Sequence, residues 1–225
     1  MAADSTPFPI FSPDTHLGLE AGVITDESSA FQNGAGYSLI NLGDLPVAAD
    51  VDGLHGLDGG QVLFSLESSA QLGDALYRPN DVILVDATGW SKALDGSAAG
   101  IPDGVNIDAV AMTGDVLLIS VDVGCQLDGL LVDDSDVIAY DQNAFSLYFD
   151  ASAAGIDPAA DVDAIHIDEQ GRLHLSFDTG GDLGGIRFDD EDVLIVDSPN
   201  WLLEFDGSAE APAWQAADLD AWSVV

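Results

Sequence analysis

The 225-residue sequence predicts an all-β fold in which one antiparallel sheet is repeated around a ring, a four-bladed β-propeller. Three observations predict it. A hydrophobic–Asp–small motif recurs four times, with its central Asp at 52, 108, 163 and 220. Short runs of β-type composition follow each copy, separated by Gly, Asp, Asn and Pro, and no segment has a convincing helical period. The two chain ends are incomplete copies that together make almost one period.

Each complete copy contains four strand-like runs in the same order. The first strands begin at VDG (51–53), IDA (107–109), VDA (162–164) and LDA (219–221). The second strands are expected at QVLFSLE (61–67), VLLISVD (116–122) and RLHLSFD (172–178). The third strands are expected at DVILVD (81–86), DVIAYD (136–141) and DVLIVD (192–197). The fourth lie within WSKALDGSAAGI (90–101), FSLYFDASAAGI (145–156) and WLLEFDGSAEAP (201–212).

The two ends of the chain complete each other. DLDAWSVV (218–225) supplies only a first strand, whereas FPIFSPD (8–14), GVITDES (22–28) and GYSLINLGDL (36–45) align with the second, third and fourth. A closed ring can share one sheet between the termini, while a linear stack would need capping repeats. We therefore predict a single propeller domain over 1–225, with blades at 50–104, 105–160, 161–217, and 218–225 plus 5–49. A β-sandwich of tandem meanders is the alternative.

The charge of the chain excludes several classes of function. It has 41 acidic residues against 4 Lys and Arg, a formal net charge of −37, yet 47% of its residues are hydrophobic, as in a packed protein. Such a surface repels nucleic-acid phosphates and anionic membranes. Self-repulsion on this scale requires high salt or a specifically bound divalent ion. We expect a monomer that neither binds nucleic acid nor inserts into a membrane.

Fourteen of the 41 acidic residues fall at strand ends that share one face of the predicted ring, and the set in the turns of the other face is sparser. They start strand one (Asp52, Asp108, Asp163, Asp220), end strand two (Asp14, Glu67, Asp122, Asp178), start strand three (Asp81, Asp136, Asp192) and end strand four (Asp95, Asp150, Asp206). First strands line the axis of a propeller. The small residue after each axial Asp fits the close approach of four strands there.

The axial acids predict a metal site. Four carboxylates around one axis resist simultaneous ionisation unless they are hydrogen-bonded or bridged by a cation. Ca²⁺ takes six to eight oxygen ligands in irregular geometry, so Ca²⁺ is the expected ion. The candidate ligands are the axial Asp52, Asp108, Asp163 and Asp220, and on the rim Asp122, Asp178, Asp136 and Asp192. Loop capping by Asp side chains, repeated through duplication, is the alternative interpretation.

Other chemistry gives weaker signals. His166 and His174 could approach across a hairpin, which makes a transition-metal site conceivable, but no zinc spacing, P-loop, dinucleotide fingerprint or nucleophile elbow occurs. With so many acids on one face, a carboxylate pair at glycosidase separation is not diagnostic. Cys125 is alone, so no intrachain disulfide can form. The strand-four aromatics Tyr37, Trp90, Phe145 and Trp201 are expected in the core between blades rather than in a sugar-stacking platform.

The glycine turn that follows a first strand, as in VDAIHIDEQGRLHLSF (162–177), resembles the hemopexin-like four-bladed propeller repeat. That family binds cations and anions in its central channel and acts mainly in protein interactions. This chain lacks the aromatic-basic signature and closing disulfide of those repeats, so the resemblance implies neither a partner nor a haem function. Residues 161–178 and 189–208 more closely resemble Asp-rich tandem repeats in large secreted or surface proteins of environmental bacteria. This resemblance implies an exported, non-catalytic, Ca²⁺-dependent module.

We therefore expect a non-catalytic binding or structural module, secreted or at the cell surface, that Ca²⁺ stabilises and that serves adhesion or surface organisation, with a glycan or surface protein as partner. Two alternatives stay open: a carbohydrate-active hydrolase or lactonase using rim carboxylates, and a propeller in the cytoplasm of a halophile whose charge serves solvation only. No apolar run approaches a transmembrane length. The first residues, MAADSTPFPIF, lack signal-peptide features, so export requires a leader removed before residue 1.

Overall fold

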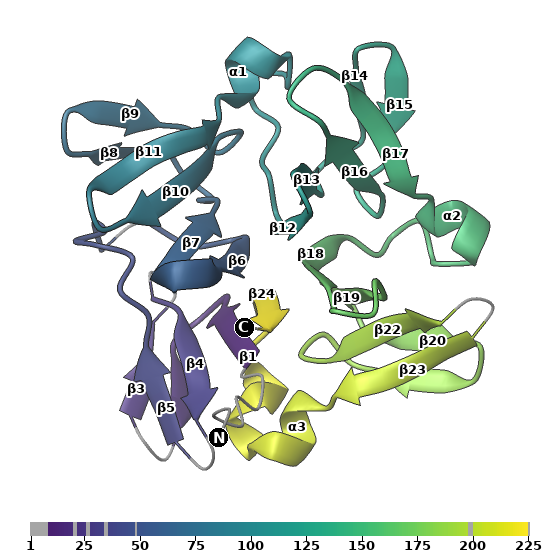
Figure 1. Cartoon of the computed structure of the whole chain (residues 1–225). Helices are drawn as coiled ribbons and strands as arrows, with labels where there is room; N and C mark the ends of the chain where they lie inside the picture. Colours follow the sequence, from purple (N-terminus) through teal and green to yellow (C-terminus); the bar gives the residue numbers. More distant parts are fainter. Residues whose placement is uncertain are drawn as a thin grey trace, which may run out of the picture.

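The computed structural model describes residues 9–19, 22–25, 28–33, 36–47, 49–197 and 200–224. Within these ranges the chain forms antiparallel strands joined by short turns, which confirms the all-β prediction. The expected sheet of four strands recurs four times, and the sheets surround a common centre (Figure 1). This differs from the two stacked layers of a β-sandwich. Among the described residues no helix is long and apolar enough to cross a bilayer.

Each sheet has the same strand order from the centre outwards. Sheet I contains β6 (Leu54–Leu57), β7 (Gln61–Phe64), β10 (Val82–Asp86) and β11 (Gly89–Leu94). Sheet II contains β12 (Val110–Thr113), β13 (Val116–Ile119), β16 (Val137–Tyr140) and β17 (Phe145–Phe149). Sheet III contains β18 (Val162–Ile167), β19 (Leu173–Phe177), β22 (Val193–Asp197) and β23 (Asn200–Phe205). Sheet IV contains β24 (Leu219–Val224), β1 (Pro9–Pro13), β4 (Ala30–Asn33) and β5 (Gly36–Leu39).

Sheet IV joins the two ends of the chain. Strand β24 pairs antiparallel with β1, with Phe11 opposite Trp222, which confirms the predicted pairing of the termini. The prediction that 22–28 forms the third strand is wrong, because β4 occupies that place. Residues 5–8 of the predicted blade lie outside the described residues.

A two-stranded hairpin between the second and third strands was not expected from the sequence. The hairpins are β8 (Ala70–Leu72) with β9 (Ala75–Tyr77), β14 (Cys125–Leu127) with β15 (Leu130–Val132), β20 (Gly181–Leu183) with β21 (Ile186–Phe188), and β2 (Leu17–Leu19) with β3 (Gly22–Ile24). In the second of these the turn is Asp128–Gly129, both with positive φ, as a type I′ turn requires. Strands of three residues are too short to show a period of two, so the sequence pattern does not predict these hairpins.

The acids predicted to end strand four start one-turn helices instead. Helix α1 (Gly96–Ala99), α2 (Ala151–Ala154) and α3 (Gly207–Glu210) follow β11, β17 and β23. The carboxylates of Asp95, Asp150 and Asp206 accept from the backbone N–H three residues later and so cap the helix N-termini. Two 3₁₀ turns, η1 (Asp58–Gly60) and η2 (Pro212–Ala216), complete the helical elements of the described chain.

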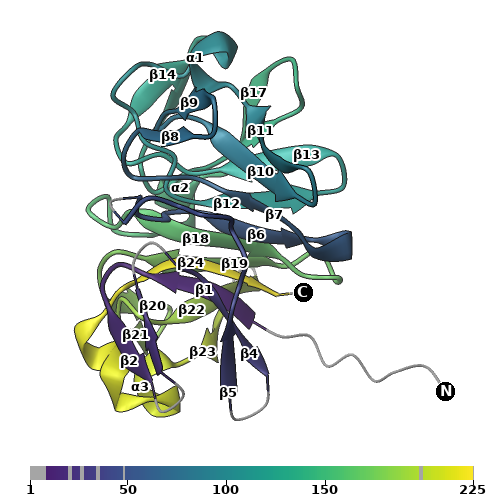
Figure 2. The same cartoon turned by 90° about the vertical axis from the view of Figure 1, so that its left-hand side faces the viewer.

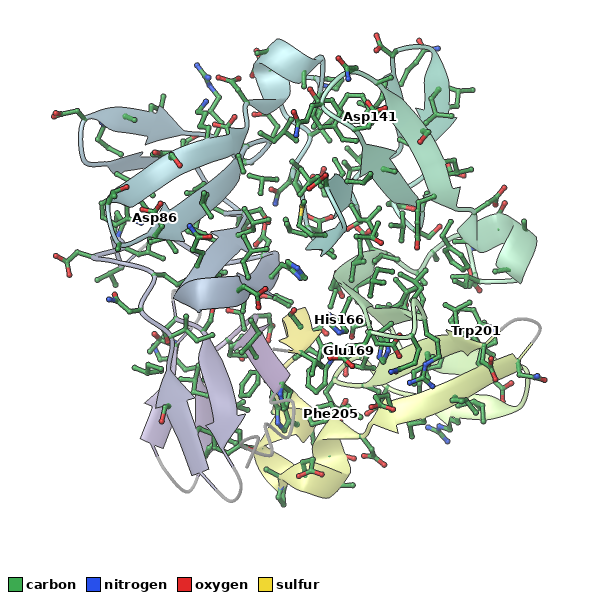
Figure 3. All side chains as sticks on the ribbon, in the orientation of Figure 1. Asp86, Asp141, His166, Glu169, Trp201 and Phe205 are labelled. Carbon is green, nitrogen blue, oxygen red and sulfur yellow. The ribbon has the colours of Figure 1, made fainter. Side chains whose placement is uncertain are left out.

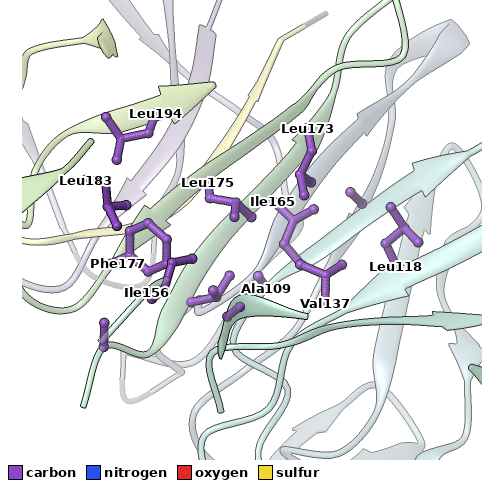
Figure 4. Packing of buried hydrophobic residues seen from close by; sticks show 14 of the residues in the cluster. Ala109, Leu118, Val137, Ile156, Ile165, Leu173, Leu175, Phe177, Leu183 and Leu194 are labelled. Carbon is purple, nitrogen blue, oxygen red and sulfur yellow. The ribbon is translucent and has the colours of Figure 1, made fainter. Parts of the chain in front are cut away.

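The hydrophobic core is divided among the junctions between adjacent sheets. One cluster lies between sheets II and III, where Leu118 and Val137 pack toward Ile165 and Leu175 (Figure 4). Three further clusters join sheets I and II, III and IV, and IV and I. Each sheet therefore buries apolar side chains against both neighbours, so the four sheets support one another around the centre.

The innermost strands meet at the middle of the molecule. Strand β12 contacts β18, β18 contacts β24, β24 contacts β6, and β6 contacts β12. Figure 2 shows these strands side by side across the molecule. Gly53 is one of the small residues expected at this convergence, and a Cβ added there would lie 2.6 Å from Ser65 Oγ and 2.9 Å from a Val110 methyl. The inner strands therefore place the residues at their starts close to one another.

Candidate functional site

An acidic pocket of about 560 Å³ opens where the inner strands begin. Its lining residues are Asp14, Asp50, Asp52, Glu67, Pro79, Gly104, Asn106, Asp108, Asp122, Asp161, Asp163 and Asp220. No basic side chain is among them. The pocket therefore concentrates negative charge contributed by all four sheets.

The structure brings the four predicted axial acids into this one pocket. Asp52 and Asp108 lie just before β6 and β12, and Asp163 and Asp220 are the second residues of β18 and β24. Asp52 Oδ2 accepts a hydrogen bond from the side-chain amide of Asn106. By contrast, Asp108 Oδ2 and Asp163 Oδ2 are buried and have no hydrogen-bond partner among the described residues.

Burial and mutual repulsion make these carboxyls weak acids. Burial, with repulsion from neighbouring carboxylates added, raises the pKa of Asp52 to about 7, of Asp108 to about 9 and of Asp220 to about 10. Burial likewise raises the pKa of Asp163 well above its ordinary value, with repulsion from Asp218 as the next cause. Without a cation, several of these groups hold protons at neutral pH.

A second ring of polar residues, two positions before the axial acids, supports the first. It consists of Asp50, Asn106, Asp161 and Asp218. Burial raises the pKa of both Asp161 and Asp218 to about 7. Sequence patterns did not single out this ring, although the tripeptides DVD, NID, DVD and DLD could have revealed it.

The acids that end strand two hold this second ring in place. The backbone N–H groups of Asn106, Asp161 and Asp218 donate to Asp122 Oδ1, Asp178 Oδ1 and Asp14 Oδ1 at 2.7, 2.8 and 2.8 Å. A backbone bond returns from each strand-two acid, as from Asp122 N–H to the Asn106 carbonyl at 3.2 Å. Of the two rim acids predicted here as ligands, Asp122 lines the pocket and Asp178 does not. Both have a hydrogen-bonding role in the structure.

The other two predicted rim ligands, Asp136 and Asp192, lie outside the pocket and are buried in turns. Asp192 Oδ2 accepts from the Asp189 N–H at 2.9 Å, and its Oδ1 accepts from the first N–H of helix α3 at 3.1 Å. Asp136 makes the equivalent bonds to the Asp133 and Ala151 N–H groups. Since both oxygens of each carboxylate have donors, hydrogen bonding accounts for these residues, and a metal role for them stays a prediction.

The pocket is not a preassembled coordination site. No three His, Cys, Asp or Glu side chains in the described ranges are arranged so that they could hold a metal ion as they stand. An ion in the pocket would therefore require carboxylates to rotate toward it or to bind it through water. Ca²⁺ tolerates such irregular, partly hydrated shells better than Mg²⁺, which demands near-ideal octahedral geometry.

A histidine cluster lies farther along the inner strands. His55, His166 and Ser223 follow the axial acids by three residues, and His174 on β19 and Asp168 after β18 complete the cluster. His166 lies near the centre of the four sheets (Figure 3). The hydroxyl of Ser223, on β24, lies 3.1 Å from His55 Nδ1 on β6 and 3.4 Å from His166 Nδ1 on β18. This hydroxyl therefore links three inner strands.

The predicted approach of His166 and His174 is observed, with ring centroids 5.3 Å apart. His174 Nε2 lies 3.3 Å from Asp168 Oδ2, to which Arg172 Nε also donates at 2.6 Å. Burial lowers the pKa of His55 to about 4 and of His166 to about 3, so both rings are neutral at pH 7. Neutral, internally hydrogen-bonded rings fit a structural role.

Comparisons with known proteins identify no family. No protein-family model and no curated protein matches the sequence. Among solved structures, the chain is similar to a protein of unknown function from Bacteroides caccae (12% identity, 89% of this chain, 57% of that one, TM-score 0.35). It is also similar to the extracellular domain assigned to a one component system of B. thetaiotaomicron (8%, 92%, 34%, TM-score 0.39) and to an inactive virginiamycin B lyase from Staphylococcus aureus (8%, 71%, 56%, TM-score 0.33). The chain spans less than two thirds of each, and similarities this distant carry no functional argument.

Proposed function

We propose that this protein is a four-bladed β-propeller whose central acidic pocket binds divalent cations, Ca²⁺ first among them, and that the bound ion stabilises a non-catalytic module for adhesion or surface organisation. Four sheets that each pack against two neighbours, with β24 closing onto β1, support the propeller. Radial closure of this kind protects sheet edges. Secretion or surface display of the module stays a prediction.

One observation carries the cation proposal. The four repeated Asp residues converge on one pocket, where the buried oxygens Asp108 Oδ2 and Asp163 Oδ2 have no hydrogen-bond partner among the described residues. A buried carboxylate oxygen without a partner is costly, because it loses hydration and gains nothing in return. A divalent cation would provide the missing partner and replace the protons that otherwise relieve the repulsion.

The chemistry of the lining favours Ca²⁺ over transition metals. All the polar lining side chains are carboxylates or an amide, which are hard oxygen donors, and the three buried histidines lie outside the pocket. Carboxylate and carbonyl oxygens suit Mg²⁺, Ca²⁺ and Mn²⁺, whereas imidazole and thiolate select zinc, copper and nickel. The size of the pocket and its dispersed ligands favour the larger, more tolerant ion.

The test is a melting and calorimetric titration of chelator-treated protein with Ca²⁺, with Mg²⁺ and with NaCl or KCl. We expect Tm to rise at micromolar to millimolar Ca²⁺, and the rise to disappear in Asp163→Asn. A rise in Tm that occurs only at molar monovalent salt would contradict the cation site and favour a halophilic surface. The observation that supports this alternative is the set of 41 acidic residues. Turnover of a glycan or lactone, lost on replacement of a pocket acid, would instead support the hydrolase alternative.

A further inference from the structure

A second cavity, of about 670 Å³, lies between sheets IV and I, away from the acidic pocket. Three segments line it: the chain after β5 (Ile40, Asn41, Gly43, Asp44), the glycines of the β6–β7 turn (Gly59, Gly60), and the β10–β11 hairpin (Val85, Asp86, Ala87, Thr88, Gly89, Trp90). We call this cavity the Trp90 groove. None of its lining residues lines the acidic pocket.

Trp90 differs from the aromatics at the same place in sheets II and III. Phe145 is 8% exposed and Trp201 7% exposed, so both are covered by their neighbours. Trp90 packs only partly against the core between sheets IV and I, and its ring lines the groove. In sheet IV the connection after β5 has no one-turn helix among its described residues, and 40–45 instead runs past Trp90.

The indole is held in a fixed position. Its Nε1–H donates to the carbonyl of buried Leu42 at 2.7 Å. Gly43 permits this close approach, because a Cβ at that position would lie 2.3 Å from the Trp90 ring. An aromatic ring fixed in this way needs little ordering when a ligand stacks against it.

Polar groups of both hydrogen-bonding types surround the ring. Asp86 lies at the β10–β11 turn (Figure 3), and its Oδ1 accepts from the Thr88 N–H and hydroxyl at 2.7 and 2.6 Å, which fixes the direction of the carboxylate. Asn41 Oδ1 accepts from the Gly43 N–H at 3.0 Å, so its amide NH₂ is the group that can donate to a ligand. Asp44 is an exposed acceptor.

The glycines leave the backbone of the groove open. A Cβ at Gly59, Gly60 or Gly89 would meet no atom within 4 Å, and all three residues have positive φ. A ligand can therefore approach the peptide groups as well as the side chains. No basic side chain lines the groove, and the net charge of −37 opposes anionic ligands.

We propose that the Trp90 groove binds a neutral oligosaccharide, with one sugar ring stacked on Trp90 and its hydroxyls bonded to Asn41, Asp44 and Asp86. The C–H face of a pyranose matches an indole face, while its hydroxyls both donate and accept. The cavity volume lies in the range of small-ligand sites, which combine an apolar surface with a few fixed polar groups. This site is independent of the cation pocket.

The experiment titrates the full chain, with saturating Ca²⁺, against cellohexaose, xylohexaose, mannohexaose and chitohexaose by calorimetry and tryptophan emission. We expect at least one sugar to bind and to shift the emission, since Trp201, Trp214 and Trp222 are buried and only Trp90 is accessible among the described tryptophans. Trp90→Ala should weaken binding by at least about tenfold. If Trp90→Ala does not fold, Asn41→Ala is the test variant instead. It removes an exposed side chain outside the core and should also weaken sugar binding.

The matched controls are Trp201→Phe, at the equivalent place in sheet III, and Asp163→Asn in the acidic pocket. Both should keep sugar binding unchanged, and Asp163→Asn should lose only the response to Ca²⁺. The proposal is overturned if none of the four sugars binds with Kd below about 10 mM. It is also overturned if Trp90→Ala and Asn41→Ala both bind the sugars as the unmodified protein does. A hexalysine peptide is titrated as a charge control, and binding of this peptide without binding of any sugar would also overturn the proposal.

Discussion

Two levels of the same inner strands carry opposite chemistry. At the acidic level, near the start of each inner strand, the residue is an Asp in all four sheets. At the histidine level, three residues later, the residue is His55, Ala111, His166 or Ser223. Burial raises the pKa of Asp52, Asp108 and Asp220 to about 7, 9 and 10 and lowers the pKa of His55 and His166 to about 4 and 3. In both cases the low dielectric disfavours the charged form, so the ion-free molecule tends toward neutral side chains at both levels.

The two levels differ in how far their partners lie within the protein. At the histidine level the Ser223 hydroxyl meets His55 Nδ1 and His166 Nδ1, and Asp168 meets His174 Nε2, while buried His174 Nδ1 has no hydrogen-bond partner among the described residues. The acidic level retains buried oxygens without partners, at Asp108 and Asp163 among the described residues. The proposed function interprets the repeated acids as a ligand site, whereas the Ser223 contacts among strands of divergent sequence form a link within the protein.

The largest expected effect comes from neutralising the acidic level. Replacement of Asp52, Asp108, Asp163 and Asp220 together by Asn should stabilise the ion-free protein by about 5 kcal/mol or more at pH 8, because folding of the parent protein requires carboxyls that are ionised in the unfolded chain to take up protons or to bury their charge. The same variant should lose the Ca²⁺-dependent rise in Tm. Urea denaturation with chelator and with Ca²⁺ measures both effects.

The matched control removes acids that lie at helix ends. Asp95→Asn, Asp150→Asn and Asp206→Asn together should change stability little, since Asn is as good an N-cap as Asp, and should keep the Ca²⁺ response. If the quadruple variant is less stable than the parent protein without Ca²⁺, the interpretation of the acidic level as repulsive is wrong.

A pH series should separate the two levels in one protein. Folded Asp52, Asp108 and Asp220 have pKa values of about 7, 9 and 10, while unfolded carboxyls titrate near 4, so their contribution to stability is full below about pH 4 and is lost as pH rises through 7 to 10. The histidine contribution is full above about pH 6.5 and is lost as pH falls through 4 to 3.

Ion-free protein should therefore lose stability progressively as pH rises from about 4.5 to 9, and Ca²⁺ should reduce this alkaline loss. Chemical denaturation at each pH gives the profile. Calorimetry in buffers of different ionisation enthalpy should show proton release on Ca²⁺ binding. If the free energy of unfolding without Ca²⁺ instead rises steadily up to pH 9, the pKa values of these acids are near normal and the interpretation of the acidic level is wrong.

The repeat made much of this arrangement predictable, and local hydrogen bonding accounts for most of what was missed. The spacing of the axial Asp residues was enough to predict their convergence, and the incomplete ends predicted that the C-terminal strand joins the sheet of the N-terminal strands. Loop capping was one of the two interpretations of Asp136, but the sequence could not choose between a cap and a ligand there or predict the N-cap role of Asp150, because a strand end, a turn and an N-cap share the same Asp preference. The Trp90 groove was not foreseen either, since it depends on how the divergent chain 40–45 crosses a neighbouring sheet.

A single Asp→Asn change should have the opposite sign outside the pocket. Both oxygens of buried Asp192 accept backbone N–H groups, so Asp192→Asn would place an amide donor against one of those donors. We expect a loss of about 2 to 4 kcal/mol, measured by urea denaturation, with the Ca²⁺ response retained. Asp206→Asn, at the half-buried N-cap of the adjacent helix α3, is the control. A Ca²⁺ response lost in Asp192→Asn but kept in Asp163→Asn would show that the ion binds at the turn.

The smallest effect should come from the histidine level, where Ser223→Ala removes the hydroxyl shared by His55 and His166. Alanine fits the position, as Ala111 shows in sheet II, so the change leaves the packing intact and deprives two buried ring nitrogens of a partner. A loss of about 1 to 2 kcal/mol is expected, with the affinity for Ca²⁺ unchanged, because the acids three residues earlier do not contact this hydroxyl. Ser146→Ala, on the exposed strand β17, is the control and should be neutral. An unchanged denaturation midpoint in Ser223→Ala would mean that packing alone joins β24 to β6 and β18, and the internal link that distinguishes this level from the acidic one would not exist.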